Sequence, residues 1–184
     1  MSTKLILLRH AESAGNARGL SDGRIDVPLS EKGKHQALAL IPKLKSLNPD
    51  IIFASPLKRV IQTIQPYVNQ KKEKIIINKL IIERACGSFD GKREGAIRKY
   101  CQARNLNRLT FGPEGGESIL QVHSRAIRFL KYLKSKKEFK NKTILIASHR
   151  NFLMALELAI RNIPIKDFYN FKRLGNADFR ILKI

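Results

Sequence analysis

Residues 4–10 read KLILLRH, an apolar run that ends on an arginine and a histidine. Residues 143–149 read TILIASH and end in the same way on a histidine. Runs of this length without polar alternation are typical of strands that are buried on both faces of a parallel sheet. Such sheets bind ligands at the carboxyl ends of their strands. The sequence therefore predicts that His10 and His149 lie together at one edge of a sheet.

Further apolar runs alternate with helical patterns along the rest of the chain. The other expected strands are Asp50–Ala54, Lys74–Ile77 and Phe179–Ile184. The expected helices are Ser30–Leu47, interrupted at Pro42, then Pro56–Asn69, Ser118–Lys136 and Phe152–Ile160. This order predicts a single α/β domain over residues 1–184, a three-layer αβα sandwich whose central sheet is mainly parallel and carries helices on both faces.

Two of these helices have recognisable start signals. Ser55 followed by Pro56 predicts an N-cap hydroxyl with proline in the first helical position. Ser118 followed three residues later by Gln121 predicts a capping box. We expect the helices to begin at these points.

The composition has an unusual charge balance. The 184 residues include 36 Lys and Arg against 15 Asp and Glu, which gives a formal net charge of +21 and an isoelectric point near 10.4. This excess favours nucleic acid, an acidic membrane face or phosphorylated small molecules as partners.

Cys86 and Cys101 match neither a disulfide framework nor a zinc signature. The apolar run before Arg9 is too short for a signal peptide, and no stretch approaches the roughly 20 apolar residues of a membrane span. We therefore expect a soluble, cytoplasmic protein.

The two strand-end histidines allow more than one kind of site. With a carboxylate such as Glu83 they could form a facial triad for a metal. Arg9 argues against this, because a permanent cation bonded to His10 repels a divalent ion. A guanidinium matches phosphate oxygens instead, and Arg59 adds another in the first turns of the helix after Ala54. The residues favour an anion site.

Six motifs in register carry a resemblance to a known family. The chain resembles the histidine phosphatase superfamily, also called the phosphoglycerate mutase-like family, over residues 4–154. The matching stretches are LILLRHAESAGN (5–16), the positions Asp26, Pro28, Leu29, Ser30, Gly33, Gln36 and Ala37, SPLKRVIQT (55–63), IIERACGSFDG (81–91), GGES (115–118) and SHR (148–150).

The resemblance implies a fold and a set of roles. It implies a phosphoglycerate mutase-like fold and a metal-independent phosphatase that needs no cofactor. His10 is implied as the nucleophile that forms a phosphohistidine, and Glu83 as the general acid and base. The groups implied to hold the phosphate are Arg9, Arg59, His149 and Asn16. Three positions depart from the family pattern: Ala11 and Arg150 replace glycines, and Phe89 stands where tryptophan or leucine is common.

A phosphoglycerate mutase is the alternative within the same family. Glu83-Arg84, with Gly87 and Gly91 after it, resembles the mutase version of the acid motif, and Asn151 also occurs there. Only 65 residues separate Glu83 from His149, however, and the classical mutases are longer in this segment. We favour hydrolysis. Several cations near the motifs are expected around the pocket entrance and predict a small, multiply charged substrate: Arg18, Arg24, Arg84, Lys92 and Arg150.

A different class of protein, one that binds a polyanion, is the third alternative. A helix and its following turn carry a basic run made of Arg125, Arg128, Lys131, Lys134, Lys136, Lys137, Lys140 and Lys142. The run predicts a solvated face, or a surface for nucleic acid or an acidic membrane, although no stacking aromatics interleave with it. His35 and His123 are expected on helix surfaces, outside the catalysis.

Overall fold

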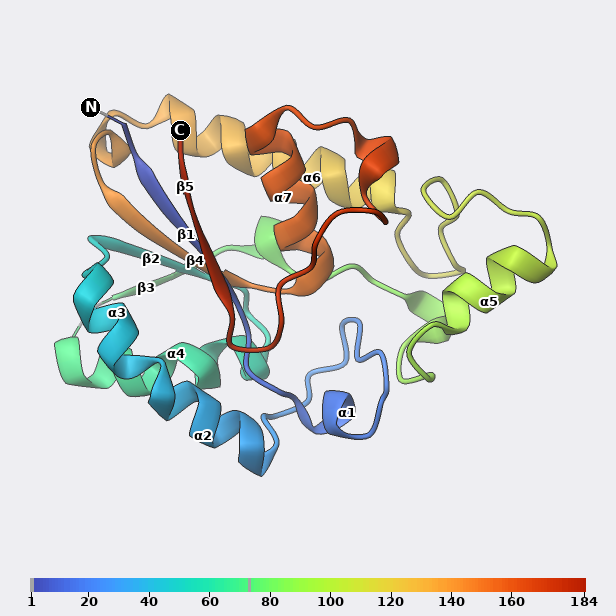
Figure 1. Ribbon diagram of the computed structural model, residues 1–184, viewed down its shortest axis with the longest axis horizontal. Helices are drawn as coiled ribbons and strands as arrows, with labels where there is room; N and C mark the ends of the chain where they lie inside the picture. Colours follow the sequence, from blue (N-terminus) through green and yellow to red (C-terminus); the bar gives the residue numbers. More distant parts are fainter. Residues whose placement is uncertain (1, 73) are drawn as a thin grey trace.

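The computed structural model describes residues 2–72 and 74–184, and its core is a five-stranded sheet of order β3-β2-β4-β1-β5 (Figure 1). Only β5 runs antiparallel to its neighbour β1; the other pairings are parallel. The strands are β1 Lys4–Arg9, β2 Ile51–Ala54, β3 Ile75–Ile77, β4 Thr143–Ser148 and β5 Phe179–Lys183. All five lie within a residue or two of the predicted ranges, which confirms a mainly parallel sheet.

The pairing of β1 with β4 sets the position of the site. Their register places Arg9 opposite Ser148. The backbone N–H of His10 donates to the carbonyl of Ser148 at 3.0 Å, just beyond the last ladder pair. His10 and His149 therefore leave the sheet side by side at its carboxyl edge, as predicted.

Helices cover both faces of this sheet. Along β1, Leu5 and Leu7 pack into one apolar core while Ile6 and Leu8 pack into another. The first core lies under α6 and α7, and the second lies under α2, α3 and α4 (Figure 1). The helices are α1 Ala14–Ala17, α2 Glu31–Ala39, α3 Ile41–Leu47, α4 Lys58–Lys71, α5 Ala96–Ala103, α6 Ile119–Ser135 and α7 Arg150–Arg161. The three-layer αβα sandwich is confirmed, and its fold is phosphoglycerate mutase-like.

The expectation that every strand is buried on both faces is wrong for the two edge strands. In β3, Ile76 and Ile77 are 43% and 50% exposed, and in β5, Ile181 is 42% exposed. Each of these strands pairs with a neighbour on one side only, because β3 and β5 end the strand order. The apolar runs therefore marked these strands correctly but overstated their burial.

The helix starts agree with the sequence in two cases and differ in one. Ser118 and Gln121 form the predicted capping box of α6, and the helical pattern around Pro42 divides into α2 and α3. The prediction that Ser55 caps α4 is wrong, because α4 begins at Lys58. The Lys58 N–H donates instead to Asp26 Oδ1 at 2.7 Å. The Ser55 hydroxyl oxygen lies 2.7 Å from His149 Nε2 instead.

The segment between Glu83 and Glu117 leaves the body of the sandwich. It contains α5, which the sequence did not predict, and it projects to one side of the sheet beyond the carboxyl ends of the strands (Figure 1). None of the described helices is both long and apolar enough to cross a membrane.

Candidate active site

A small cavity of about 50 Å³ lies at the carboxyl edge of the sheet; we call it the inner cavity. Six of the predicted site residues line it: Arg9, His10, Asn16, Arg59, Glu83 and Arg150. They come from the end of β1 and the residue after it, from α1, α4 and α7, and from the start of segment 83–117, which we call the α5 arm. The fold thus brings together residues that are up to 141 positions apart in the chain.

The His10 side chain has a defined hydrogen-bonding state. It is 4% exposed, and its Nδ1 lies 2.7 Å from the carbonyl oxygen of Ala11. A carbonyl oxygen only accepts, so Nδ1 carries the hydrogen and Nε2 keeps its lone pair in the neutral ring. Burial, followed by the charges of Arg59 and Arg9, lowers the pKa of His10 well below its ordinary value. The ring is therefore a neutral imidazole at physiological pH, with Nε2 available as a nucleophile.

His149 lies behind His10 and is completely buried. The two rings are 5.1 Å apart between centroids and meet edge to face. The Nε2 atom of His149 lies 2.7 Å from the hydroxyl oxygen of Ser55, and this contact orients the His149 ring. Burial and then the charge of Arg59 lower the pKa of His149 as well. The structure brings His149 next to His10 but does not place it in the lining of the inner cavity.

Arg9 and Arg59 face the inner cavity with donors to spare. Arg9 donates from Nη1 to the carbonyl of Leu174 at 2.9 Å. Arg59 donates to two carbonyls, those of Ile25 at 2.8 Å and Gly23 at 2.7 Å. The Nε of each arginine is buried without a hydrogen-bond partner, and neither arginine forms an ion pair, within the part of the chain that the structure describes. The inner cavity is also lined by Asp22, Glu83 and Glu94, but none of these carboxylates forms an ion pair with Arg9 or Arg59, so both guanidinium groups are suited to binding an anion.

Burial also affects the acidity of these two arginines. It is the largest cause lowering the pKa of Arg9, to about 10, and the pKa of Arg59 is lowered by burial too. Both guanidinium groups remain charged at neutral pH.

A second amide, which the sequence did not single out, orients Asn16. Asn176 lies just before β5, and its Nδ2 donates to Asn16 Oδ1 at 3.0 Å and to the carbonyl of His10 at 3.2 Å. With its Oδ1 engaged, Asn16 has its NH₂ group left for an acceptor in the inner cavity. Ser13 caps α1 and donates its hydroxyl hydrogen to buried Asp22, which holds the loop that carries Asn16.

Glu83 reaches the inner cavity from the connection that follows β3. Its side chain accepts from the Arg84 N–H at 2.8 Å through Oε1, and Oε2 lies 3.5 Å from the Asn151 N–H in the first turn of α7. The residue is 8% exposed and lines the same cavity as His10. A carboxyl group held at the opening of an anion site is suited to exchanging a proton with a bound ester oxygen or with water.

A partly buried ionic cluster holds the backbone next to Glu83 in place. Glu117 accepts from Arg125 and from Arg24, and also from the Ala85 N–H at 3.1 Å. Burial alone would raise the pKa of Glu117, but the hydrogen bonds and charge of Arg125 outweigh it and lower that pKa. Arg24 donates in addition to the carbonyl of Glu83 at 3.0 Å. Arg125 is thus 8% exposed and internal, which corrects its assignment to the basic surface.

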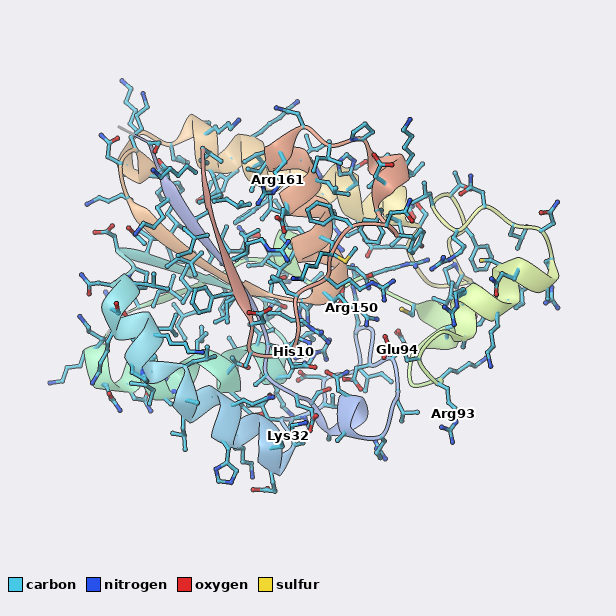
Figure 2. The ribbon with its side chains drawn as sticks, viewed as in Figure 1. His10, Lys32, Arg93, Glu94, Arg150 and Arg161 are labelled. Carbon is cyan, nitrogen blue, oxygen red and sulfur yellow. The ribbon has the colours of Figure 1, made fainter. Side chains whose placement is uncertain are left out.

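Some of the cations expected around the pocket entrance line a cavity, and others do not. Arg150 lines the inner cavity and pairs with Glu94; Figure 2 shows this pair between His10 and the arm that carries α5. Arg84 is 4% exposed, and its Nε and Nη2 donate to the carbonyls of Glu117 and Phe111. It lines a second, larger cavity. Arg18 and Lys92, which were expected near the entrance, are exposed and line neither cavity.

The structure also bears on the two cysteines and on the alternative of a metal site. Cys86 and Cys101 are both buried and unpaired with each other. Burial raises the pKa of the Cys86 thiol to about 12, so this thiol is protonated. Across residues 2–72 and 74–184, no group of three or more His, Cys, Asp and Glu side chains is arranged to hold a metal ion.

The fold and these residues define a class of protein. A family model for the histidine phosphatase superfamily (branch 1) matches residues 5–184, so the chain belongs to this superfamily. The resemblance stated from the motifs is thereby confirmed, and the superfamily's enzymes are phosphatases or phosphoglycerate mutases.

Three similar proteins illustrate this range. Phosphoserine phosphatase 1 of Hydrogenobacter thermophilus is 32% identical over 185 residues, which cover 97% of this chain and 85% of that protein. A 2,3-bisphosphoglycerate-dependent phosphoglycerate mutase of Bartonella henselae is 29% identical over 172 residues, covering 89% and 84%. A solved mycobacterial glucosyl-3-phosphoglycerate phosphatase, in complex with VO3, superposes with a TM-score of 0.87 at 23% identity, covering 97% and 90%, and shares the fold.

Proposed function

We propose that this chain is a metal-independent phosphatase that hydrolyses a small phosphomonoester through a phosphohistidine on His10. The observation that carries the proposal is the state of His10: a neutral ring whose Nδ1–H is bound by Ala11 and whose Nε2 retains its lone pair. A neutral imidazole can attack phosphorus, whereas an imidazolium cannot. The same cavity holds two arginines with free donors, Arg9 and Arg59, which suit a dianionic phosphoryl group.

In the first step the phosphoryl group moves from the substrate to His10. The Nε2 lone pair forms a bond to phosphorus while the ester P–O bond breaks. Arg9 and Arg59, with the amide of Asn16, stabilise the charge that spreads over the three phosphoryl oxygens. Glu83 donates its proton to the departing ester oxygen, so that a neutral alcohol leaves. The enzyme is left with a phosphohistidine and a Glu83 carboxylate.

In the second step water takes the place of the alcohol. The Glu83 carboxylate accepts a proton from the water as its oxygen bonds to phosphorus. The P–N bond breaks, inorganic phosphate leaves, and Nε2 recovers its lone pair. Glu83 is protonated again, and both groups are ready for the next substrate.

Hydrolysis rather than transfer to a second substrate is supported by the comparison with known proteins. The relative from Hydrogenobacter thermophilus, which matches 97% of the chain, is a phosphatase. The mutase alternative rests on Glu83-Arg84 and on the mutase relatives.

One incubation separates these two reactions. The chain is mixed with 3-phosphoglycerate and catalytic 2,3-bisphosphoglycerate, and free phosphate and 2-phosphoglycerate are both followed. Phosphate release should be faster. Isomerisation that outpaces phosphate release would assign the chain to the mutases.

The phosphohistidine can be tested by trapping. Glu83→Gln still accepts the phosphoryl group from p-nitrophenyl phosphate, whose leaving group needs no acid, but it cannot activate the water. A ³²P-labelled aryl phosphate should therefore label Glu83→Gln at one equivalent after an alkaline quench, and Glu83→Gln/His10→Ala should remain unlabelled. His35→Ala, which removes an exposed histidine on α2, is the matched control and should turn over like the wild type. Label in the His10→Ala background, or no activity on any phosphomonoester, would contradict the proposal.

The substrate that we propose carries more than one negative charge. Arg150 lies at the opening of the inner cavity, and Arg84 contributes charge to the wall of the adjoining one. A simple monoester gains from Arg150 alone, whereas a bisphosphate or an acid-bearing phosphoester also gains from Arg84. The ratio of kcat/KM between such a substrate and a simple monoester measures this preference, and a ratio of one would contradict it.

A further inference from the structure

A second cavity of about 420 Å³ adjoins the inner one; we call it the outer cavity. Five residues line both: Ser21, Cys86, Glu94, Arg150 and Asn151. The α5 arm forms one wall, and the segment that contains Phe168, Tyr169 and Arg173 forms another. A substrate whose phosphoryl group reaches His10 therefore extends its remainder into the outer cavity.

The charge of the outer cavity is strongly unbalanced. Six arginines line it: Arg84, Arg93, Arg98, Arg108, Arg150 and Arg173. Among the lining residues, all of which the structure describes, Glu94 is the one carboxylate, and it is already paired with Arg150. Such an excess of cations on a concave surface attracts an anion and is relieved by it.

Arg108 is held in place rather than free in solvent. Its guanidinium carbon lies 3.6 Å from the centre of the Tyr169 ring, a stacked cation–π contact. The Tyr169 hydroxyl donates to the backbone carbonyl of Arg108 at 3.0 Å, which ties the two residues together twice. The Nε of Arg108 is buried and has no hydrogen-bond partner in the described part of the chain. A pre-oriented guanidinium with an unused buried donor is a built feature of the cavity.

Arg173 faces Arg150 and Arg108 without a carboxylate of its own. Burial is the largest cause that lowers its pKa, and the charges of Arg150 and Arg108 lower it further. Glu94 acts in the opposite direction, but it is shared with Arg150. The Arg173 side chain is exposed, and its charge lies near two other cations, so a bound anion would reduce the repulsion among them.

The size of the outer cavity gives information about the substrate. At roughly 30 Å³ per water molecule, 420 Å³ corresponds to about 14 waters. A three-carbon acid has six or seven non-hydrogen atoms and would fill less than half of this space. Phe89 and Tyr169 add aromatic surface to the lining. The volume falls in the range that encloses ligands of sugar or nucleoside size.

We propose that the outer cavity is a second anion site, in which Arg108 and Arg173 bind a phosphate or carboxylate carried by the remainder of the substrate. The substrate class is then a phosphomonoester of sugar or nucleoside size with a second anionic group. This rests on the proposed phosphatase function and specifies which substrates it acts on. Arg150 lies between the two anions, where it contacts both cavities.

Matched substrate pairs test the second anion. The pairs are adenosine 3′,5′-bisphosphate with adenosine 5′-monophosphate, and fructose 1,6-bisphosphate with fructose 6-phosphate. Wild type should prefer the bisphosphate by at least tenfold in kcat/KM in one of the pairs, and Arg108→Gln/Arg173→Gln should lose most of this preference. A variant that merely misfolds would lose activity on both members equally and keep the ratio.

A matched arginine serves as the control. Arg104 lies on the same arm and stacks on Tyr100, but it lines neither cavity. Arg104→Gln should keep both the activity and the ratio. A ratio near one in wild type, or a ratio unchanged in Arg108→Gln/Arg173→Gln, would overturn the proposal. A higher kcat/KM for phosphoserine than for either bisphosphate would contradict the proposed sugar or nucleoside size of the substrate.

Binding without turnover separates this inference from the phosphatase proposal. In the His10→Ala background, calorimetric titration with adenosine 3′,5′-bisphosphate should show binding at least tenfold tighter than with the monophosphate. The Arg108→Gln/Arg173→Gln substitutions should remove the difference. If His10 supports hydrolysis of p-nitrophenyl phosphate but no pair is discriminated, the second anion site alone is wrong. If the site binds as expected but no phosphomonoester is hydrolysed, the phosphatase function alone is wrong.

Discussion

Arg125 binds Glu117 through two hydrogen bonds of 2.9 Å, from Nε and Nη2, and the same guanidinium donates to the carbonyls of Leu80 and Ile82. One buried arginine thereby connects a carboxylate to the backbone that leads into Glu83. Arg24 completes the connection from the opposite side, through its bonds to Glu117 and to the Glu83 carbonyl. The position of Glu83, the proposed general acid, depends on these three charges.

Glu117 is therefore predicted to act as a positioning residue for Glu83. Glu117→Gln removes the charge that Arg24 and Arg125 share, which should lower the free energy of unfolding by about 1–3 kcal/mol. It should also displace the acid, so that kcat on alkyl phosphates falls by roughly 100-fold, the lower end of what acid catalysis contributes. Hydrolysis of p-nitrophenyl phosphate should fall much less, because its leaving group needs no proton.

The comparison of leaving groups separates positioning from general damage. Glu114→Gln, which alters an exposed carboxylate in the same loop, is the control and should change neither rate. Equal losses on alkyl and aryl phosphates in Glu117→Gln would show that the cluster does not act through the acid.

The sequence predicted the residues that depend on strand ends. His10 and His149 follow apolar runs directly, so once the runs are strands the parallel register alone brings the histidines together. Glu83 and Arg59 were assigned to the site through the resemblance of their motifs to the family. These positions needed no knowledge of distant contacts.

The misassigned and missing residues depend on contacts between distant parts of the chain. Ser55 looked like a helix cap, but its partner His149 is 94 residues away. Asn176 acts on Asn16 across 160 residues, and no local pattern marks it. Arg125 was grouped with the basic run because its helical neighbours are basic, whereas its burial follows from Glu117. Pairings of this kind arise from tertiary structure and leave no periodic signal.

The two buried histidines should make the protein sensitive to acid. His10 and His149 both have a pKa below the roughly 6.5 of an unfolded chain. As pH falls below about 6.5, these two histidines bind protons in the unfolded chain but stay neutral in the folded chain, so the unfolded state is favoured. Stability is thus fully present above that pH and is lost progressively below it, by about 1.4 kcal/mol for each unit of pKa difference.

Urea unfolding at pH 7.5 and 5.5 measures this effect. Wild type should lose stability between the two values, and His10→Asn/His149→Asn should lose clearly less. His35→Ala should behave like the wild type, because its imidazole is exposed. If the doubly substituted protein shows the full loss, the acid sensitivity has another origin.

Asn176 is predicted to support phosphate binding through Asn16. Asn176→Ala removes the hydrogen bond that orients the Asn16 amide. The inhibition constant for inorganic phosphate should therefore rise about fivefold, as expected for the loss of one neutral hydrogen bond. Asn16→Ala should raise it at least as much. Asn170→Ala changes an exposed amide and should have no effect.

The double variant decides whether the two amides act together. If Asn176 acts only through Asn16, the double variant should bind phosphate no worse than Asn16→Ala. Fully additive losses would mean that Asn176 contributes independently of Asn16.

Seven of the 36 Lys and Arg residues form a basic surface away from the cavities, and all of them are exposed: Arg128, Lys131, Lys134, Lys136, Lys137, Lys140 and Lys142. This surface surrounds the end of α6 and the start of β4, while His149 follows the end of β4 (Figure 1). Six strand residues at about 3.3 Å each place roughly 20 Å between the two ends. The basic surface and the phosphate site should therefore act independently.

We predict that this surface gives salt-dependent, sequence-independent binding to duplex DNA. The slope of the logarithm of the DNA-binding constant against the logarithm of the salt concentration should become less steep by about 0.9 for each phosphate contact removed. It should therefore become less steep by up to about 4 in the fourfold variant Lys131→Gln/Lys134→Gln/Lys137→Gln/Lys140→Gln. The kcat/KM of this variant on a phosphomonoester should stay within about twofold of wild type, and His10→Ala should bind DNA like the wild type. An unchanged slope would remove the role of the surface, and loss of DNA binding in His10→Ala would show that the polyanion enters the phosphate site instead.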